Sequence, residues 1–130
     1  MTAFKPGVRK RINSFYVTNA TILLGNLKPE SVDLIFADPP YNLSKSRFVM
    51  HFSTSGGKDL STYKGAWDQF RSLGDYESFV YSWAVESWRV LKPGGSLWVA
   101  GTYHNIYIIG SVLQKLGFTI INEVLWHKTD

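Results

Sequence analysis

The sequence predicts an α/β fold in which helices cover a parallel, doubly wound sheet. Apolar runs of strand length alternate with segments of helical periodicity, and short turns that contain glycine join them. The chain has 130 residues, enough for a single domain with a real core. Four strands and two helices are expected, which is few for this architecture.

The first two strands are predicted at Thr21 to Leu24 and at Val32 to Ala37. The first is a short apolar run that stops at Gly25-Asn26. The second is nearly continuous in apolar residues, as expected of a parallel strand covered on both faces. It leads directly into Asp38. Residues 42–70 follow as a long polar loop, and loops of that length in compact domains are usually functional or mobile.

An amphipathic helix is predicted from Asp75, its expected N-cap, to the turn at Pro93-Gly94-Gly95. A third strand is expected at Ser96 to Ala100, and a second helix at Tyr103 to Leu116 with Gly117 as its C′ residue. The fourth strand is expected at Phe118 to Trp126. The inward faces of the two helices should carry Tyr76, Phe79, Val80, Trp83, Ala84, Ser87 and Leu91, and Ile106, Ile109, Val112, Leu113 and Leu116.

Composition excludes several classes of protein. The absence of cysteine rules out disulfides and thiolate metal sites, and a reducing cytoplasm is the natural compartment. No apolar run reaches the roughly 18 residues that cross a bilayer. The net charge of +4 fits a polyanionic partner such as nucleic acid, but a solvated basic tail explains it equally well. The three histidines have no spacing that indicates a metal site.

The motif Asp38-Pro39-Pro40-Tyr41 stands where ligands bind in such sheets, beyond the carboxyl end of a strand. The Asp38 carboxylate and the Pro39 carbonyl could each accept one N–H of an exocyclic amine. They would localise its lone pair and stabilise the positive charge that develops on nitrogen. The prolines have a fixed φ and no N–H, so the turn is rigid and rich in acceptors. Tyr41 offers a face on which a flipped-out base can stack.

Four stretches resemble, in order, the N-terminal half of β-class DNA adenine N6 methyltransferases: VDLIFADPPYNL, WDQF, RVLKPGGSLWVAGTYHNI and LGFTIINEVLWHK. The resemblance covers Thr21 to Lys128 and is closest to the group that includes the cell-cycle-regulated enzyme reading GANTC. It implies a partial sheet of the S-adenosylmethionine-dependent methyltransferase type, with S-adenosylmethionine as methyl donor and double-stranded DNA as substrate.

The resemblance also implies residue roles. The catalytic motif maps onto Asp38, Pro39, Pro40 and Tyr41, and no metal is needed. Asn26, Asp38 and Pro39 correspond to cofactor-binding positions, although the family usually has Gly-Asp where this chain has Gly25-Asn26. Asn26 cannot supply a carboxylate. The loop after Tyr41 closes near DNA in the family, so Lys45, Arg47, Lys58 and Lys64 are candidate phosphate contacts, or else simply solvated loop residues.

Residues 1–20 are expected to form a basic arm, and residues 21–130 the N-terminal, catalytic-motif part of an incomplete methyltransferase domain. Family members continue into a target-recognition region and a glycine-rich cofactor loop, and no FxGxG occurs in this chain. We therefore expect the 130 residues alone to be inactive or very weak. Uncovered apolar strands favour self-association or pairing with a complementary C-terminal half.

Three alternatives remain. The same acceptor geometry serves cytosine N4, although that group more often begins with Ser than with the acid at Asp38. Methylation of a glutamine amide in a protein fits less well, because those enzymes favour Asn at this position. A non-catalytic DNA-binding remnant of the same fold is the alternative from a different class, supported by the basic balance of the chain.

Overall fold

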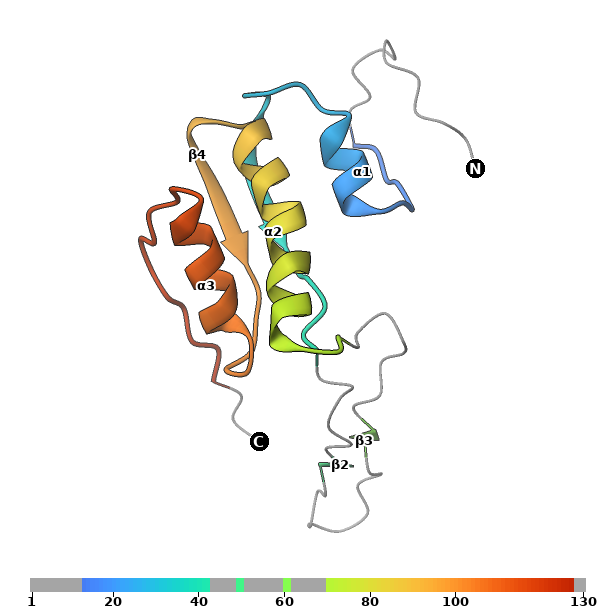
Figure 1. The fold of residues 1–130 in the computed structure, drawn as a ribbon. Coiled ribbons are helices and arrows are strands. Elements are labelled where there is room, and N and C mark those ends of the chain that lie inside the picture. The colour runs from blue at the N-terminus through green and yellow to red at the C-terminus, as the bar shows by residue number, and fades with distance from the viewer. Residues whose placement is uncertain (1–12, 43–48, 51–59, 62–69, 128–130) are drawn as a thin grey trace.

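A computed structural model of the chain describes residues 13–42, 49–50, 60–61 and 70–127. Its elements, in chain order, are α1 (Ala20–Gly25), β1 (Val32–Ala37), β2 (Val49–Met50), β3 (Leu60–Ser61), α2 (Leu73–Val90), β4 (Leu91–Val99) and α3 (Ile106–Lys115) (Figure 1). The architecture is mixed α/β, as predicted. None of the helices in these residues is long and apolar enough to span a membrane.

The two longer strands, β1 and β4, pair in parallel. Cα partners run from Leu34 opposite Ser96 to Ala37 opposite Val99, so both strands end at the same edge. Within the described residues this sheet has two strands, whereas a larger doubly wound sheet was predicted. The β2 and β3 segments form a separate antiparallel pair inside the long polar loop.

The strand predicted at Ser96 begins earlier, because β4 already pairs with β1 through Leu91. The register shifts between Val32 and Leu34 of β1, where the Pro93-Gly94-Gly95 segment of β4 bulges out. Gly94 has a φ of 79°, and a Cβ at Gly95 would lie 2.9 Å from the Lys92 carbonyl oxygen. Both positions therefore require glycine.

Helix α2 begins one turn before the predicted start. Ser72 is its N-cap, and its hydroxyl accepts a hydrogen bond from the Asp75 backbone N–H at 3.0 Å. Asp75, which was expected to be the N-cap, lies instead in the first turn, where its negative charge suits the positive end of the helix dipole. The helix ends at Val90, because Leu91 is already extended with a ψ of 137°.

The core lies between α2, α3 and one face of the sheet (Figure 1). Its buried members, Tyr76, Val80, Trp83, Ala84, Ile109, Val112 and Leu113, were all predicted to face inward. Ala37, Leu97 and Val99 add the sheet's contribution from the two strands. The other face of the sheet is uncovered in the described residues: Leu34, Phe36 and Trp98 are 57%, 70% and 53% exposed. The prediction that β1 is covered on both faces is therefore wrong for this part of the chain.

Helix α3 starts at Ile106, three residues after the predicted start, and ends as predicted before Gly117. Gly117 has a φ of 101° and donates its N–H to Gln114, while Phe118 donates to the Leu113 carbonyl at 3.0 Å. These two bonds make a Schellman motif, in which a left-handed glycine closes the helix.

The strand predicted at Thr21 to Leu24 is wrong, because these residues belong to helix α1. Asn19 is the N-cap, and its side-chain oxygen accepts from the Thr21 backbone N–H at 2.9 Å. At the other end, the Arg89 guanidinium of α2 donates to the carbonyls of Leu24 and Leu27 at 2.8 and 3.0 Å. A four-residue apolar run is compatible with either a strand or a helical turn. The hydrogen bonds of Asn19 and Arg89 stabilise the helix here.

The strand predicted at Phe118 to Trp126 is also wrong, since residues 118–127 have no strand pairing. The apolar pattern is present, but among the described residues no neighbouring strand offers a ladder of hydrogen bonds. Ile121, Leu125 and Trp126 are accordingly 82%, 85% and 86% exposed. An extended apolar segment becomes a strand only where a partner satisfies its backbone.

Replacing Arg89 by Met should lower the free energy of unfolding by about 1 to 2 kcal/mol, because the half-buried guanidinium bonds two carbonyls of the α1 end as well as Glu86. Urea unfolding followed by circular dichroism measures this. Lys115→Met is the matched control: it breaks an exposed ion pair to Glu77 and should cost about 0 to 1 kcal/mol. Equal losses in the two variants would contradict the role of Arg89.

Candidate active site

The candidate site is the turn Asp38 to Asn42, which leaves β1 at the carboxyl edge of the sheet. Strand β4 and the N-terminal ends of α2 and α3 reach the same edge (Figure 1). Asp38 is exposed, and Pro39, Pro40 and Tyr41 are half-buried. The four predicted catalytic residues therefore lie in one turn, at the edge where the sheet topology predicts a ligand.

Within the turn, the Tyr41 hydroxyl donates a hydrogen bond to Oδ1 of Asp38. Burial raises the pKa of Tyr41 from 10.0 to about 12, and the hydrogen bond to Asp38 and the charge of its carboxylate act in the same direction. The phenol thus keeps its proton at neutral pH and acts as a donor.

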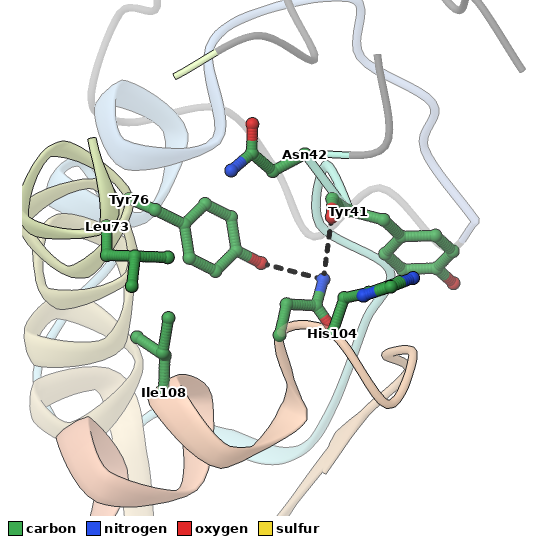
Figure 2. Close-up of a pocket in the computed structure, with 7 residues that line it drawn as sticks. Tyr41, Asn42, Leu73, Tyr76, His104 and Ile108 are labelled. Atoms are coloured by element: carbon green, nitrogen blue, oxygen red, sulfur yellow. Dashed lines mark hydrogen bonds between the residues drawn. The ribbon is translucent and has the colours of Figure 1, made fainter. Parts of the chain in front are cut away.

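The backbone of the turn is held from both helices. The Tyr76 hydroxyl, on α2, donates to the Pro40 carbonyl at 3.0 Å. The side-chain amide of Asn105, the N-cap residue of α3, donates to the Tyr41 carbonyl at 3.2 Å and to the Tyr76 hydroxyl at 3.0 Å. Figure 2 shows the bonds to the Tyr41 carbonyl and the Tyr76 hydroxyl as dashed lines. Tyr76 and Asn105 are 1% and 2% exposed, so this network is shielded from water.

Asn42 joins the two ends of the long loop. Its side-chain oxygen accepts a hydrogen bond from the Phe70 backbone N–H at 3.1 Å, and its own backbone is left-handed with a φ of 56°. The Phe70 ring meets Tyr76 edge-on, with ring centroids 5.0 Å apart. The segment between residues 42 and 70 therefore leaves and re-enters the fold at the candidate site.

A cavity of about 200 Å³ opens beside the turn. Side chains of the turn and of the first turns of both helices line it, among them Tyr41, Asn42, Leu73, Tyr76, His104 and Asn105 (Figure 2). Its lining combines aromatic rings with amide and imidazole groups, which suits a planar ligand with polar edges.

Asn26, a predicted cofactor-binding residue, does not join this cluster. Asn26 is the C-cap of α1, before the start of β1, and its side-chain amide donates to the Ile22 carbonyl at 2.7 Å. It therefore lies at the opposite end of β1 from Asp38. Lys45, Arg47, Lys58 and Lys64, the proposed DNA contacts, lie outside the described residues. Across the residues that are described, no group of three His, Asp or Glu side chains could hold a metal ion.

Sequence reasoning did not assign Tyr76 or Asn42 to the site. For Tyr103-His104-Asn105 it left two roles open, lining a base or cofactor pocket and capping the helix, and His104 and Asn105 do line the cavity. Tyr76 was predicted as a core residue, and it is one, but its hydroxyl also donates a hydrogen bond to the Pro40 carbonyl of the candidate turn. The signal for Asn105 is its position after the end of β4, at the same edge as Asp38, but its bonds to the Tyr41 carbonyl and the Tyr76 hydroxyl were not predicted.

Comparison with known proteins agrees with this arrangement. Residues 32–130 match the family described as DNA methylase. The chain is 45% identical over 108 residues to the Type II methyltransferase M2.LlaDCHI of Lactococcus lactis subsp. cremoris, covering 83% of this chain and 39% of that protein. The Type II methyltransferases M2.DpnII of Streptococcus pneumoniae and M.HinfI of Haemophilus influenzae are 44% and 36% identical. They match 82% and 97% of this chain and 38% and 34% of their own lengths.

The chain therefore spans less than two fifths of the length of the curated relatives that it matches. The matched region, by contrast, takes in β1, α2, β4 and α3, together with the whole of the Asp38 to Asn42 turn. Fold, turn and similarity agree, and the chain belongs to the DNA methylase family.

Proposed function

We propose that the chain is the catalytic-motif part of a site-specific DNA methyltransferase that methylates adenine N6 in duplex DNA after flipping the base. In finer classification we place it in the β class, near the group that reads GANTC. The observation that carries the proposal is the Asp-Pro-Pro-Tyr turn at the carboxyl edge of the sheet, with the Asp38 side chain exposed there.

The chemistry follows from the nature of the amine. The lone pair of an exocyclic amine is delocalised into its ring, so the nitrogen is a weak nucleophile. Hydrogen bonds from its two N–H groups to Asp38 and to the Pro39 carbonyl favour a tetrahedral nitrogen and stabilise the charge that it acquires as the methyl group is transferred.

The hydrogen bonding of the turn supports this assignment of acceptors. The Pro40 and Tyr41 carbonyls are occupied by Tyr76 and Asn105. Among the described residues no donor bonds the Pro39 carbonyl, which leaves its lone pairs for an incoming amine. Oδ1 of Asp38 already accepts from Tyr41, but a carboxylate has about four lone-pair sites and can accept a second donor.

S-adenosylmethionine, the methyl donor that the family implies, would supply an electrophilic methyl group on a sulfonium centre. The described residues fit only part of it. The cavity of about 200 Å³ is smaller than the roughly 300 Å³ at which ligand pockets usually begin, and Asn26 lies at the other end of β1. Asp38 and Pro39 are the residues that we place beside its methyl end.

Adenine is favoured over cytosine N4 by the acid at the head of the motif. Both bases present an exocyclic amine that the acceptors could bind, so the geometry of the turn serves either. Mass analysis of nucleosides after incubation with DNA distinguishes the two products, and N4-methylcytosine in place of N6-methyladenine would overturn the adenine assignment.

For DNA we propose Lys45, Arg47, Lys58 and Lys64 as phosphate contacts. The hydrogen bond from the Phe70 N–H to the Asn42 side chain supports this proposal. It holds both ends of the segment that carries these four residues beside the catalytic turn. Phosphate contacts should make the affinity for DNA fall as the salt concentration rises, and they should not favour any DNA sequence.

We further propose that the uncovered face of the sheet packs against additional polypeptide of the same methyltransferase domain. Leu34, Phe36 and Trp98 form an apolar surface on this face, and the matched relatives are more than twice as long as the chain. Such a surface on two paired strands is typical of a protein interface. Without that polypeptide we expect methyl transfer to be absent or very weak.

Asp38→Ala should abolish methyl transfer, a loss of at least about 100-fold, because it removes an acceptor that stabilises the developing charge. DNA binding should be mostly intact, since Asp38 is exposed and carries none of the core. Transfer of labelled methyl groups to DNA by the protein with its whole methyltransferase domain measures this. Asp33→Ala, on the same strand but paired with Lys92, is the control that should keep full turnover. Retained turnover in Asp38→Ala would contradict the assignment of Asp38 as a catalytic residue.

Spectrophotometric titration of the tyrosines should include a component with a pKa of about 12 that belongs to Tyr41, so that this component is absent in Tyr41→Phe and retained in Tyr107→Phe. Between about pH 10 and 12 the folded chain holds this proton while the unfolded chain, with a value of 10.0, loses it. The free energy of unfolding therefore falls as pH rises through that window. A Tyr41→Phe variant that keeps the component would contradict the burial of this hydroxyl against Asp38.

Phe36→Thr and Trp98→Thr should each weaken binding of the proposed additional polypeptide by at least about tenfold, because each removes an exposed aromatic side chain from the uncovered face. The probe is the part of the Lactococcus lactis relative that lies outside the matched region, co-purified with the full chain. Tyr107→Thr, which removes a ring that is 76% exposed on α3, is the control. Equal binding in all variants, or sedimentation of the chain as a homodimer through this face, would contradict the proposed occupant.

A further inference from the structure

Asn105 occupies the N-cap position of α3 but does not cap the helix. An asparagine at this position normally accepts hydrogen bonds from the backbone N–H groups two or three residues further on. Here no such bond forms, and the side-chain oxygen instead accepts from the Thr102 backbone N–H at 2.8 Å. The side chain is thereby turned away from its own helix and toward the catalytic turn.

The bonds of this amide use its whole hydrogen-bonding capacity. Its nitrogen donates to the Tyr41 carbonyl and to the Tyr76 hydroxyl, while its oxygen accepts from the backbone N–H and from the hydroxyl of Thr102. Serine, threonine or aspartate could cap a helix equally well, but none has an NH₂ group that donates twice. The residue type therefore matches the contacts to the turn rather than the capping position.

The contacts fix the torsions that the prolines leave free. The rings of Pro39 and Pro40 set φ at those residues, but ψ remains soft. The direction of a carbonyl follows the ψ angle of its own residue, so the bond from Tyr76 fixes ψ of Pro40. The bond from Asn105 fixes ψ of Tyr41 in the same way. With both carbonyls directed into the protein, Asp38 and Pro39 are left at the accessible end of the turn.

We propose that Asn105 and Tyr76 are positioning residues that hold the Asp38 to Tyr41 turn in the shape that receives the amine. The inference rests on the proposed function for its catalytic consequence, but the restraint on the turn can be tested without activity. Neither residue touches the reacting atoms. Each acts through a backbone carbonyl of the turn.

The first test is independent of methyl transfer and uses the 130-residue chain. In Asn105→Ser the turn loses its contact from α3, so the Tyr41 ring should become hydrated and separate from Asp38. The tyrosine component near pH 12 should then move toward 10, whereas Tyr107→Phe should leave it unchanged. An unaltered component in folded Asn105→Ser would overturn the proposal.

The second test is kinetic and uses the protein with its whole methyltransferase domain. Tyr76→Phe removes one hydroxyl and keeps the ring in the core, so it should fold even where Asn105→Ser does not. We expect kcat to fall about 10- to 100-fold while KM for DNA is unchanged, as for a small misplacement of catalytic groups. The circular dichroism spectrum should match that of the wild type.

The outcomes of the two tests distinguish the positioning role of Asn105 and Tyr76 from the proposed methyl transfer. Wild-type kcat in Tyr76→Phe would overturn the positioning role. A fall in kcat that accompanies an equal loss of folded protein would also overturn it, because a purely structural effect then suffices. If the wild-type protein transfers no methyl group, the proposed function fails, and the titration of Asn105→Ser alone decides whether these residues restrain the turn.

Discussion

The parallel pairing of β1 and β4 is the constraint on which the candidate site depends. Because the two strands run in the same direction, both end at one edge, and the helix that follows each strand begins there. The Asp38 turn, the start of α2 and the start of α3 thus converge, although Tyr41 and Asn105 are 64 residues apart in sequence. An antiparallel arrangement would place the start of α3 at the opposite edge, and the amide could not reach the turn.

Because of the same strand pairing, one side chain, Tyr76, belongs both to the core and to the candidate site. Tyr76 belongs to the buried cluster between α2 and α3, and its hydroxyl is the donor to Pro40. Its burial is feasible because the hydroxyl both donates and accepts a bond, which avoids the cost of about 1 to 3 kcal/mol for an unsatisfied buried polar group. Packing of the helices therefore determines where the turn stands.

Elements that local interactions specify could be predicted from the sequence, whereas elements that depend on distant residues could not. Strand β1 and the inward face of α2 were predicted correctly, because local apolar patterns specify them. Thr21 to Leu24 was mistaken for a strand, since a distant residue, Arg89, secures its helix. Phe118 to Trp126 has a strand pattern without a paired neighbour in the described residues. The turn itself was predictable from its place after β1, but the partners of its carbonyls come from residues far along the chain.

Asn105 shows most clearly why such partners escape sequence reasoning. The sequence left two roles open for the stretch that contains Asn105, lining the pocket and capping the helix, and in the structure its side chain lines the cavity and does not cap α3. The direction of the amide is decided by what surrounds it: a half-buried carbonyl of the turn and a buried phenol both accept its N–H groups. At the start of α3, the Ile106 and Ile108 N–H groups donate instead to the Thr102 and Asn105 backbone carbonyls. Satisfying these groups outweighs capping the helix, and the residue at the start of α3 therefore supports the Asp38 to Asn42 turn.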